Sequence, residues 1–311
     1  MNQVGRYKTC WYKGECVKAT MIGFSAILMW GLLALLTSLT NRIPPLQLTA
    51  MTFTIAFGVG LLFWGLKGAD PNCFKQPVRV WLNGICGLFG YHIFYFIALK
   101  NAPVVDASLI AYLWPLLIVI FSAVLPNEKL KWFHLAGAIT GFAGATVILL
   151  KGGTLTLKPE YIFGYMAAFL CALIWSAYSV ISRALGESPT ELIGGVCGVT
   201  AFLSAMCHLL LEKTTSLSPS EWLAVIAMGI GPVGGAFFAW DYGIKHGNIK
   251  MLGTLSYTAP LISTISLIYF GRAEPNWYTA IACFLIVVGA ALAALDTIKQ
   301  FIRAKIIHGT T

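Results

Sequence analysis

Residues 90–116 read GYHIFYFIALKNAPVVDASLIAYLWPL, and residues 235–261 repeat them in altered form as GAFFAWDYGIKHGNIKMLGTLSYTAPL. The two stretches align without a gap at an offset of 145 positions. The identical pairs are Gly90 and Gly235, Lys100 and Lys245, Tyr112 and Tyr257, Pro115 and Pro260, and Leu116 and Leu261. Such a constant spacing indicates that the chain consists of two copies of one repeat.

The same offset pairs residues outside these stretches, since Trp30 falls on Trp175 and Trp132 falls on Trp277. Most of each half is therefore predicted to belong to the repeat. The predicted organisation is a basic tail at residues 1–19, a first repeat at 20–150, a second repeat at 161–296 and a basic tail at 297–311.

The composition is typical of a chain that lies in a lipid bilayer. Hydrophobic residues make up 58% of it and charged residues 11%, whereas an ordinary soluble domain carries about 25% charged residues. The long apolar stretches are each about the 20 residues that a helix needs to cross the hydrocarbon. They lie at about residues 20–39, 46–66, 80–100, 103–125, 132–150, 161–183, 190–211, 222–244, 249–270 and 277–296.

These apolar stretches predict helices, because they are continuously apolar and do not alternate as barrel strands do. The predicted fold class is an all-α integral membrane protein with ten transmembrane helices in two five-helix repeats. Because five is odd, the two copies must cross the membrane in opposite directions. Inverted repeats are typical of secondary transporters, whose halves rock about a shared site.

The basic residues predict the orientation. Of the 21 Lys and Arg residues, fifteen fall on the N-terminal tail, the C-terminal tail and every second loop. The positive-inside rule then predicts that both termini are cytoplasmic. The same bias explains the formal charge of +9, because basic tails are attracted to the lipid surface. No nucleic-acid partner is therefore expected.

No motif for a metal, a cofactor or catalysis is present in the sequence. The eight cysteines include no CxxC pair, and the chain has no HExxH, no paired acidic motif and no GxxxxGK[ST] sequence. These absences predict no metal site, no cofactor and no ATP-driven mechanism. A membrane-embedded enzyme is the less favoured alternative.

Several aromatic residues lie near mid-depth of the predicted helices, away from the interfacial belt where Trp and Tyr are common. Their polar atoms need partners in a bilayer, so they are expected to face the bundle interior. Two interpretations stay open: a satisfied core network, or a substrate pocket. The candidate substrate-binding residues are Trp30, Tyr91, His92, Tyr112, Trp114, Trp175 and Tyr257.

Pro115 and Pro260 stand near the centres of the fourth and ninth predicted helices. A proline in a helix removes one backbone hydrogen bond and usually bends the helix. Because the two are related by the repeat, they are the candidate hinges.

Two titratable residues in the predicted helices have alternative interpretations. Asp241 is either paired with Lys245, four residues later on the same helix face, or a site for a proton or a substrate amine. His92 is either a proton relay or a neutral, hydrogen-bonded core residue.

The repeat and its motifs resemble the drug/metabolite transporter superfamily, in its EamA-type branch. The residues that carry the resemblance are Trp30-Gly31, Trp175-Ser176, Ala98-Leu99-Lys100, Tyr112-x-x-Pro115 and Tyr257-x-x-Pro260. Tyr91-His92 and Tyr112-x-Trp114, with Trp30 and Trp175, are similar to the pocket residues of aromatic amino-acid exporters in that branch. Asp241 has no place in the pattern of that branch.

The resemblance implies a bacterial inner-membrane transporter with a central, mainly aromatic cavity. We therefore predict a secondary transporter that exports amino acids, aromatic or other neutral ones, or related small metabolites by alternating access. The alternative within the class is uptake or exchange of another metabolite or drug-like compound. Strongly anionic substrates are disfavoured, because Arg and Lys are essentially absent at mid-depth. The sequence leaves the oligomeric state open.

Overall fold

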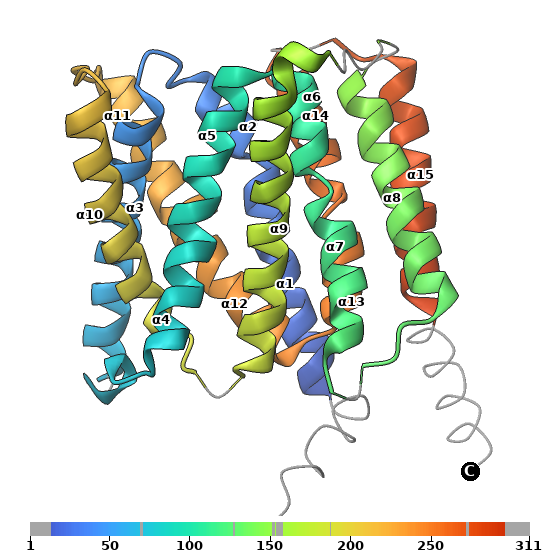
Figure 1. The fold of residues 1–311 in the computed structure, drawn as a ribbon, viewed down its shortest axis with the longest axis horizontal. Coiled ribbons are helices and arrows are strands. Elements are labelled where there is room, and N and C mark those ends of the chain that lie inside the picture. Colours follow the sequence, from blue (N-terminus) through green and yellow to red (C-terminus); the bar gives the residue numbers. More distant parts are fainter. Residues whose placement is uncertain are drawn as a thin grey trace, which may run out of the picture.

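The computed structural model describes residues 14–295, apart from residues 69–70, 127, 151–152, 154–157, 187 and 272–273. The described residues form a bundle of helices with no strand (Figure 1). Residues 1–13 of the predicted N-terminal tail and all of the predicted C-terminal tail lie outside the described residues.

The first half of the chain makes five passes through the bundle. They are α1 Gly14–Gly31 with α2 Leu33–Ser38, α3 Pro45–Lys67, α4 Val78–Ile85 with α5 Tyr91–Asn101, α6 Val104–Ala111 with α7 Trp114–Phe121, and α8 Trp132–Leu150. Helix α1 begins within the stretch predicted as a tail, and Glu15 in its first turn suits the positive end of the helix dipole.

The second half makes five corresponding passes. They are α9 Ile162–Ala184, α10 Leu192–Leu211, α11 Pro219–Ile230 with α12 Ala236–His246, α13 Ile249–Leu255 with α14 Thr258–Tyr269, and α15 Trp277–Ala293. Short 3₁₀ turns lie at Pro71–Phe74, Ser122–Val124 and Pro159–Tyr161.

The number of passes agrees with the predicted fold class. In the part of the chain that the structure describes, nine helical segments are long and apolar enough to cross a membrane. The tenth, α15, has 17 residues and packs along the whole of α8. The prediction of an all-α membrane protein with ten crossings in two repeats is confirmed.

The duplication is repeated in details of local structure that the sequence did not reveal. Cys86–Gly90 and Gly231–Gly235 are both π-helical turns, and the second lies 145 positions after the first. Each turn leads into a helix of 11 residues, α5 in the first repeat and α12 in the second. A π-turn inside a helix often marks a functional position, and both copies carry one at the same point of the repeat.

Two faces of the bundle are distinguished below. The terminal face is the end at which α1 begins and α15 ends, at the bottom of Figure 1, and the distal face is the opposite end. Helices α8 and α15 form one edge of the bundle, α3 and α10 form the other, and α1, α9 and α12 lie between them.

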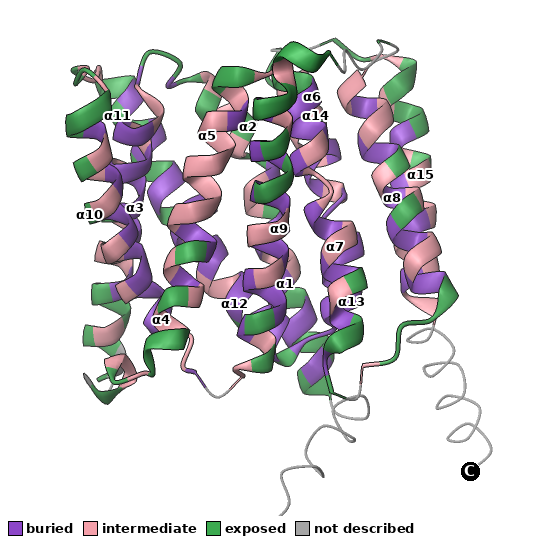
Figure 2. Ribbon diagram, in the orientation of Figure 1, coloured by how far each residue is buried: buried purple, intermediate pink, exposed green. Residues whose placement is uncertain are grey.

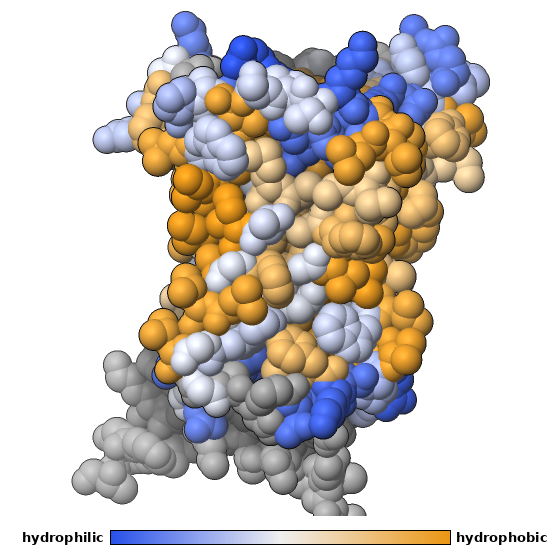
Figure 3. Space-filling view, turned by 90° about the vertical axis from the view of Figure 1, so that its left-hand side faces the viewer, coloured by the Kyte–Doolittle hydropathy of each residue, from blue (hydrophilic) through white to orange (hydrophobic). Residues whose placement is uncertain are grey.

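Buried residues face the interior of the bundle, while exposed residues cover the outside (Figure 2). Many exposed residues are large and apolar, such as Leu62, Leu66 and Leu210. Figure 3 shows apolar side chains across the middle of one side, with hydrophilic groups gathered toward its ends. This distribution is the one expected of a surface in contact with lipid.

Glycines allow close approach at two helix pairs. A Cβ atom on Gly137 of α8 would lie 2.6 Å from the Gly289 carbonyl oxygen of α15, and one on Gly289 would lie 2.7 Å from the Gly137 carbonyl oxygen. Gly23 of α1 and Gly243 of α12 meet in the same way. Small residues drive packing here because no hydrophobic effect brings helices together in lipid.

Candidate functional site

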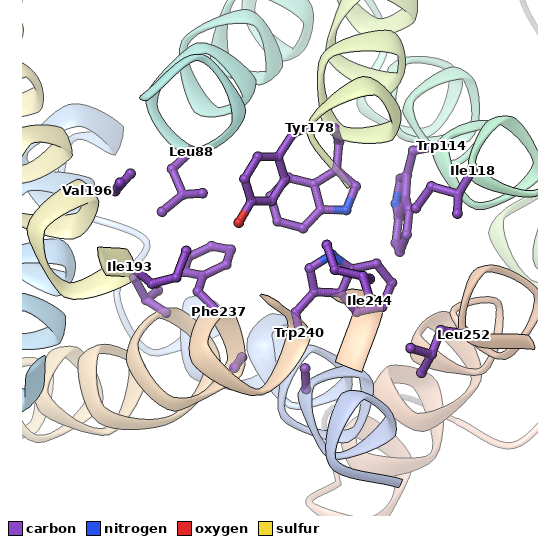
Figure 4. Packing of buried hydrophobic residues seen from close by; sticks show 14 of the residues in the cluster. Leu88, Trp114, Ile118, Tyr178, Ile193, Val196, Phe237, Trp240, Ile244 and Leu252 are labelled. Atoms are coloured by element: carbon purple, nitrogen blue, oxygen red, sulfur yellow. The ribbon is translucent and has the colours of Figure 1, made fainter. Parts of the chain in front are cut away.

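Four tryptophans meet near the centre of the bundle, and we call them the tryptophan cluster. They are Trp30 of α1, Trp114 at the start of α7, Trp175 of α9 and Trp240 of α12. The Trp30 ring centroid lies 5.2 Å from that of Trp240 and 5.6 Å from that of Trp175. Trp114 and Trp240 meet edge to face at 5.7 Å (Figure 4). The three predicted tryptophans are therefore brought together from both repeats.

Trp240 was not among the predicted site residues. It lies at the repeat counterpart of Tyr95. It stands four residues before the end of the eighth apolar stretch, 222–244, so counting along that stretch did not place it at mid-depth. Its side chain is fully buried, and its indole Nε1–H donates to the Ser179 hydroxyl at 3.1 Å.

Two more polar groups of the cluster have partners. The Trp30 Nε1–H donates at 2.9 Å to the carbonyl oxygen of Pro232, which lies within the π-turn before α12. The Ser176 hydroxyl donates to the Trp114 carbonyl oxygen at 3.0 Å. These bonds fix the Trp30 ring and the backbone at Trp114 in place.

Tyrosines of α5 extend the cluster toward the distal face. The Tyr91 ring lies 5.4 Å from Trp175 and stacks on Tyr95 at 5.9 Å. Tyr112, at the break between α6 and α7, is close to both tyrosines. All three tyrosines keep part of their surface accessible, whereas Trp175 is buried. They therefore form the accessible side of the site.

His92 lies beside the cluster and is anchored to the π-turn. Its Nδ1 lies 2.7 Å from the Leu88 carbonyl oxygen, which a neutral imidazole satisfies by donating from Nδ1. Its ring packs edge to face against Phe53 at 5.2 Å and against Phe237, which also contacts Trp30. Within the described residues Nε2 has no hydrogen-bond partner.

Tyr257 does not join the other predicted residues. Its side chain is fully buried in a second apolar cluster with Ala145, Leu261 and Ile286. Its hydroxyl accepts a hydrogen bond from the Leu116 N–H at 3.0 Å. In this structure the Tyr257 side chain points from the ninth pass toward the helix pair α8 and α15.

The candidate hinge prolines lie just after breaks in their helices. The helical pattern stops at Tyr112 and Leu113 and resumes with α7, in which Pro115 is the second residue. It stops again at Ser256 and Tyr257 and resumes with α14, in which Pro260 is the third residue. The fourth and ninth passes are thus interrupted at corresponding depths.

Asp241 forms an ion pair on the terminal side of the cluster. Its Oδ2 lies 2.7 Å from the Lys245 Nζ and accepts a hydrogen bond from the Thr190 hydroxyl at 2.7 Å. The Lys245 ammonium also donates to the Ser188 carbonyl oxygen at 3.0 Å. Of the two alternatives for Asp241, the structure shows the pair with Lys245.

A small cavity of about 20 Å³ lies beside this pair, lined by Tyr178, Ser182 and Asp241 among others. The buried Tyr178 hydroxyl has no hydrogen-bond partner among the described residues. A cavity of this size and polarity has room for one water molecule.

A second charged group on the terminal face combines residues far apart in the sequence. The Glu128 carboxylate pairs with Arg183 and with Lys250, each at 2.7 Å. Arg183 also donates to the carbonyl oxygens of Ile244 and Gly247, each at 2.7 Å. We call these three side chains the Glu128 network. It joins the segment after α7, the end of α9 and the connection from α12 to α13.

A larger hollow, of about 640 Å³, has none of the four tryptophans in its lining. Its lining includes Ile22 of α1, Val59 and Phe63 of α3, and Phe238 and Tyr242 of α12. It contains none of the predicted site residues, so it does not define the candidate site.

Comparisons with known proteins identify the family. The model of the EamA-like transporter family matches twice, at residues 17–150 and 162–295. This chain belongs to that family. The resemblance noted in the sequence is confirmed, and this EamA-like transporter is a multi-pass membrane protein that moves small molecules across a lipid bilayer.

Three similar proteins illustrate the relationship. The aromatic amino acid exporter YddG of Ancylobacter novellus is 54% identical over 278 residues, which are 89% of this chain and 97% of that protein. The Salmonella typhimurium exporter of the same name is 26% identical over 266 residues, covering 79% and 86%. A crystal structure of a chain that is 53% identical matches with a TM-score of 0.87, over 91% of this chain and 99% of that one.

Proposed function

We propose that this EamA-like transporter exports amino acids, aromatic or other neutral ones, or closely related metabolites, across the bacterial inner membrane by alternating access. The observation that carries the proposal is the tryptophan cluster, which both repeats build near the centre of the bundle. The names of the two similar exporters support the same substrate class. We also propose that both termini are cytoplasmic, from the excess of basic residues on the terminal face.

Alternating access is supported by a difference between the two ends of the bundle. At the terminal face α7 packs against α13, and α12 packs against α9. The repeat counterparts at the distal face are α6 with α14 and α5 with α1, and these pairs scarcely touch. The interrupted helices thus converge at the terminal face and diverge at the distal face. An inverted repeat exchanges two such arrangements when it opens to the other side.

A charged network strengthens closure at the terminal face. The Glu128 network lies there and connects the two repeats, because Glu128 belongs to the first and Arg183 and Lys250 to the second. The pair of Asp241 and Lys245 lies within α12. The repeat counterparts of Asp241, Arg183 and Lys250 are Phe96, Ser38 and Val105, which carry no charge. Opening the terminal face therefore requires the ion pairs of Glu128 to separate. At the distal face, Arg42 of the first repeat and Glu221 of the second also form an ion pair, at 2.8 Å, but the Arg42 side chain is 67% exposed.

The cluster suits a substrate with an apolar or aromatic side chain. We propose that Trp30, Trp114 and Trp175 contact the side chain, because aromatic rings pair edge to face or offset with gains of about 0.5–1.5 kcal/mol each. An ammonium group gains from the ring faces by cation–π attraction. The hydroxyls of Tyr91 and Tyr112 are available to donate to the carboxylate. The Nε2 of His92 is available to accept a proton.

Counterflow into proteoliposomes tests the proposal. Purified protein would be offered labelled phenylalanine, tryptophan, threonine, methionine and an organic cation, with and without a pH gradient. We expect saturable movement of the aromatic amino acids, and at least about a tenfold loss for Trp175→Ala, the order of magnitude for removing a central aromatic anchor. Trp222→Ala, at an exposed residue of α11, is the matched control.

Movement of none of these amino acids by wild-type protein would contradict the substrate class. Wild-type rates in Trp175→Ala would contradict the pocket. A C-terminal fluorescent-protein fusion, which matures in the cytoplasm, tests the proposed orientation separately.

A further inference from the structure

Each repeat leaves one backbone amide without its helical partner. In a continuous helix the Leu116 N–H would donate to the carbonyl oxygen four residues back, at Tyr112. The break at Tyr112 and Leu113 removes that bond. Within the hydrocarbon no water is available to replace it, so the amide needs another acceptor.

The acceptor comes from the other repeat. The Tyr257 hydroxyl oxygen lies 3.0 Å from the Leu116 nitrogen, and the tyrosine side chain is fully buried. Tyr257 and Tyr112 are the first residues of the duplicated Tyr-x-x-Pro motif, and Leu116 directly follows the proline of its own copy. The tyrosine of the second motif thus satisfies the amide that the first motif exposes.

Because the motif is duplicated, a reciprocal pair exists. Tyr112 is the counterpart of Tyr257, and Leu261 is the counterpart of Leu116. Their bond is not made in this structure. Within the described residues the Tyr112 hydroxyl has no hydrogen-bond partner and its side chain is partly accessible, while the Leu261 N–H donates to no residue outside its own helix.

The bond that is made belongs to the end of the bundle that is closed. It joins the start of α7 to the ninth pass, where α7 packs on α13 so closely that a Cβ atom on Gly253 would lie 3.1 Å from the Pro115 carbonyl oxygen. The bond that is missing would join α14 to the fourth pass, where α6 and α14 diverge.

We propose that Tyr112 and Tyr257 are alternate latches of the transport cycle. Tyr257 accepts the Leu116 N–H in the state that is closed at the terminal face. Tyr112 accepts the Leu261 N–H in the state that is closed at the distal face, and Tyr257 is then released toward the interior. This inference rests on the proposed alternating access. It makes both tyrosines positioning residues and gives a reason why Tyr257 lies outside the tryptophan cluster here.

The test compares Tyr257→Phe with Tyr112→Phe in full-length protein, in lipid nanodiscs and without substrate. Hydrogen–deuterium exchange is followed in peptides from α12–α13 at the terminal face and from α5–α6 at the distal face. Tyr257→Phe orphans the Leu116 amide only in the present state. Exchange should therefore rise about tenfold at the terminal face and fall at the distal face, as expected for losing one buried hydrogen bond.

Tyr112→Phe destabilises only the opposite state, so it should lower exchange at the terminal face. The double variant should return toward the wild-type balance. Tyr278→Phe, at an exposed residue of α15, is the matched control and should change neither face.

Three results would overturn the latches: shifts in the same direction in both variants, no shift in either, or a uniform rise at both faces, which reports general loosening. Because no substrate is present, these results do not depend on the substrate class. Amino-acid counterflow by the wild-type protein would then still stand. Opposite shifts without any counterflow would keep the latches and reject the proposed substrates.

Discussion

Helices α5 and α12 are copies of each other, yet they occupy different environments. Both have 11 residues and follow a π-turn at the same position of the repeat. Only Ala98 of α5 is buried, whereas α12 buries seven residues, including Trp240, Asp241 and Lys245. Lys100 of α5 is exposed, and its counterpart Lys245 lies in an ion pair. Equal sequence positions therefore gave equal helices but unequal packing.

The contact residues show how the difference arises. Gly23 of α1 meets Gly243 of α12, and their counterparts Ala168 of α9 and Ala98 of α5 are buried in a common cluster. Glycine pairs let α12 lie closer to α1 than alanine pairs allow between α5 and α9. Helix α12 also packs on α9, while α5 makes no comparable contact with α1.

The largest expected effect comes from breaking the buried ion pair of α12. Asp241→Ala leaves the Lys245 ammonium buried without a counter-charge, which typically costs about 3–5 kcal/mol. We expect a clear loss of thermal stability, measured as Tm in lipid nanodiscs. The matched control on α5 is Lys100→Leu, an exposed residue for which the change should stay within about 0.5 kcal/mol.

The double variant Asp241→Leu with Lys245→Leu separates the charge from the packing. Because both charges are gone, it should recover most of the lost Tm. A double variant as unstable as Asp241→Ala would show that the pair is needed for more than charge balance.

A smaller effect is expected at the glycine contact. Gly243→Ala makes α12 resemble α5, and the new Cβ would lie 2.9 Å from the Gly23 nitrogen, which is backbone and cannot move away easily. Forcing an extra methyl group into packed space costs about 1–3 kcal/mol, which again would lower Tm. The converse change, Ala98→Gly, should cost about 1 kcal/mol from helix propensity. Equal Tm values for Gly243→Ala and wild type would mean that the close contact is not required.

The smallest of these effects concerns the Glu128 network, whose members keep some contact with solvent. The side chains of Glu128 and Arg183 are 13% and 19% exposed, so the stability change from Glu128→Gln should be only about 1–2 kcal/mol. We expect mainly a shift in the balance between the states closed at the terminal face and at the distal face. Deuterium exchange should rise at α12–α13 and stay unchanged at α8 and α15. Exchange that rises equally in all helices would assign the network to general stability alone.

Much of the site was predictable from the sequence because lipid restricts where polar aromatic residues can lie. Trp30, Trp114 and Trp175 were placed at mid-depth by counting along their apolar stretches, and the structure brings them together. Trp240 stands four residues before the end of its apolar stretch, 222–244, so counting did not place it at mid-depth. Tyr257 was placed at mid-depth too, but depth alone does not tell which side of a helix faces the centre.

Other features had no local signal. The residues of the Glu128 network are separated by 55 positions or more, and their Lys and Arg members were read only as evidence of orientation. The π-turns likewise lie in glycine-rich segments, and nothing in the sequence predicted them. These contacts depend on which helices become neighbours.

The sequence by itself determined that the chain spans a membrane, that ten helices do so, and that five are a copy of the other five in inverted orientation. It could do so because hydrocarbon requires long apolar helices and because duplication is written directly in the residues. Only the tertiary structure decided that the terminal face is closed, that Asp241 is paired with Lys245, and that Tyr257 rather than Tyr112 holds a backbone amide. The two repeats have similar patterns of residues, so which face closes depends on contacts between helices far apart in the chain.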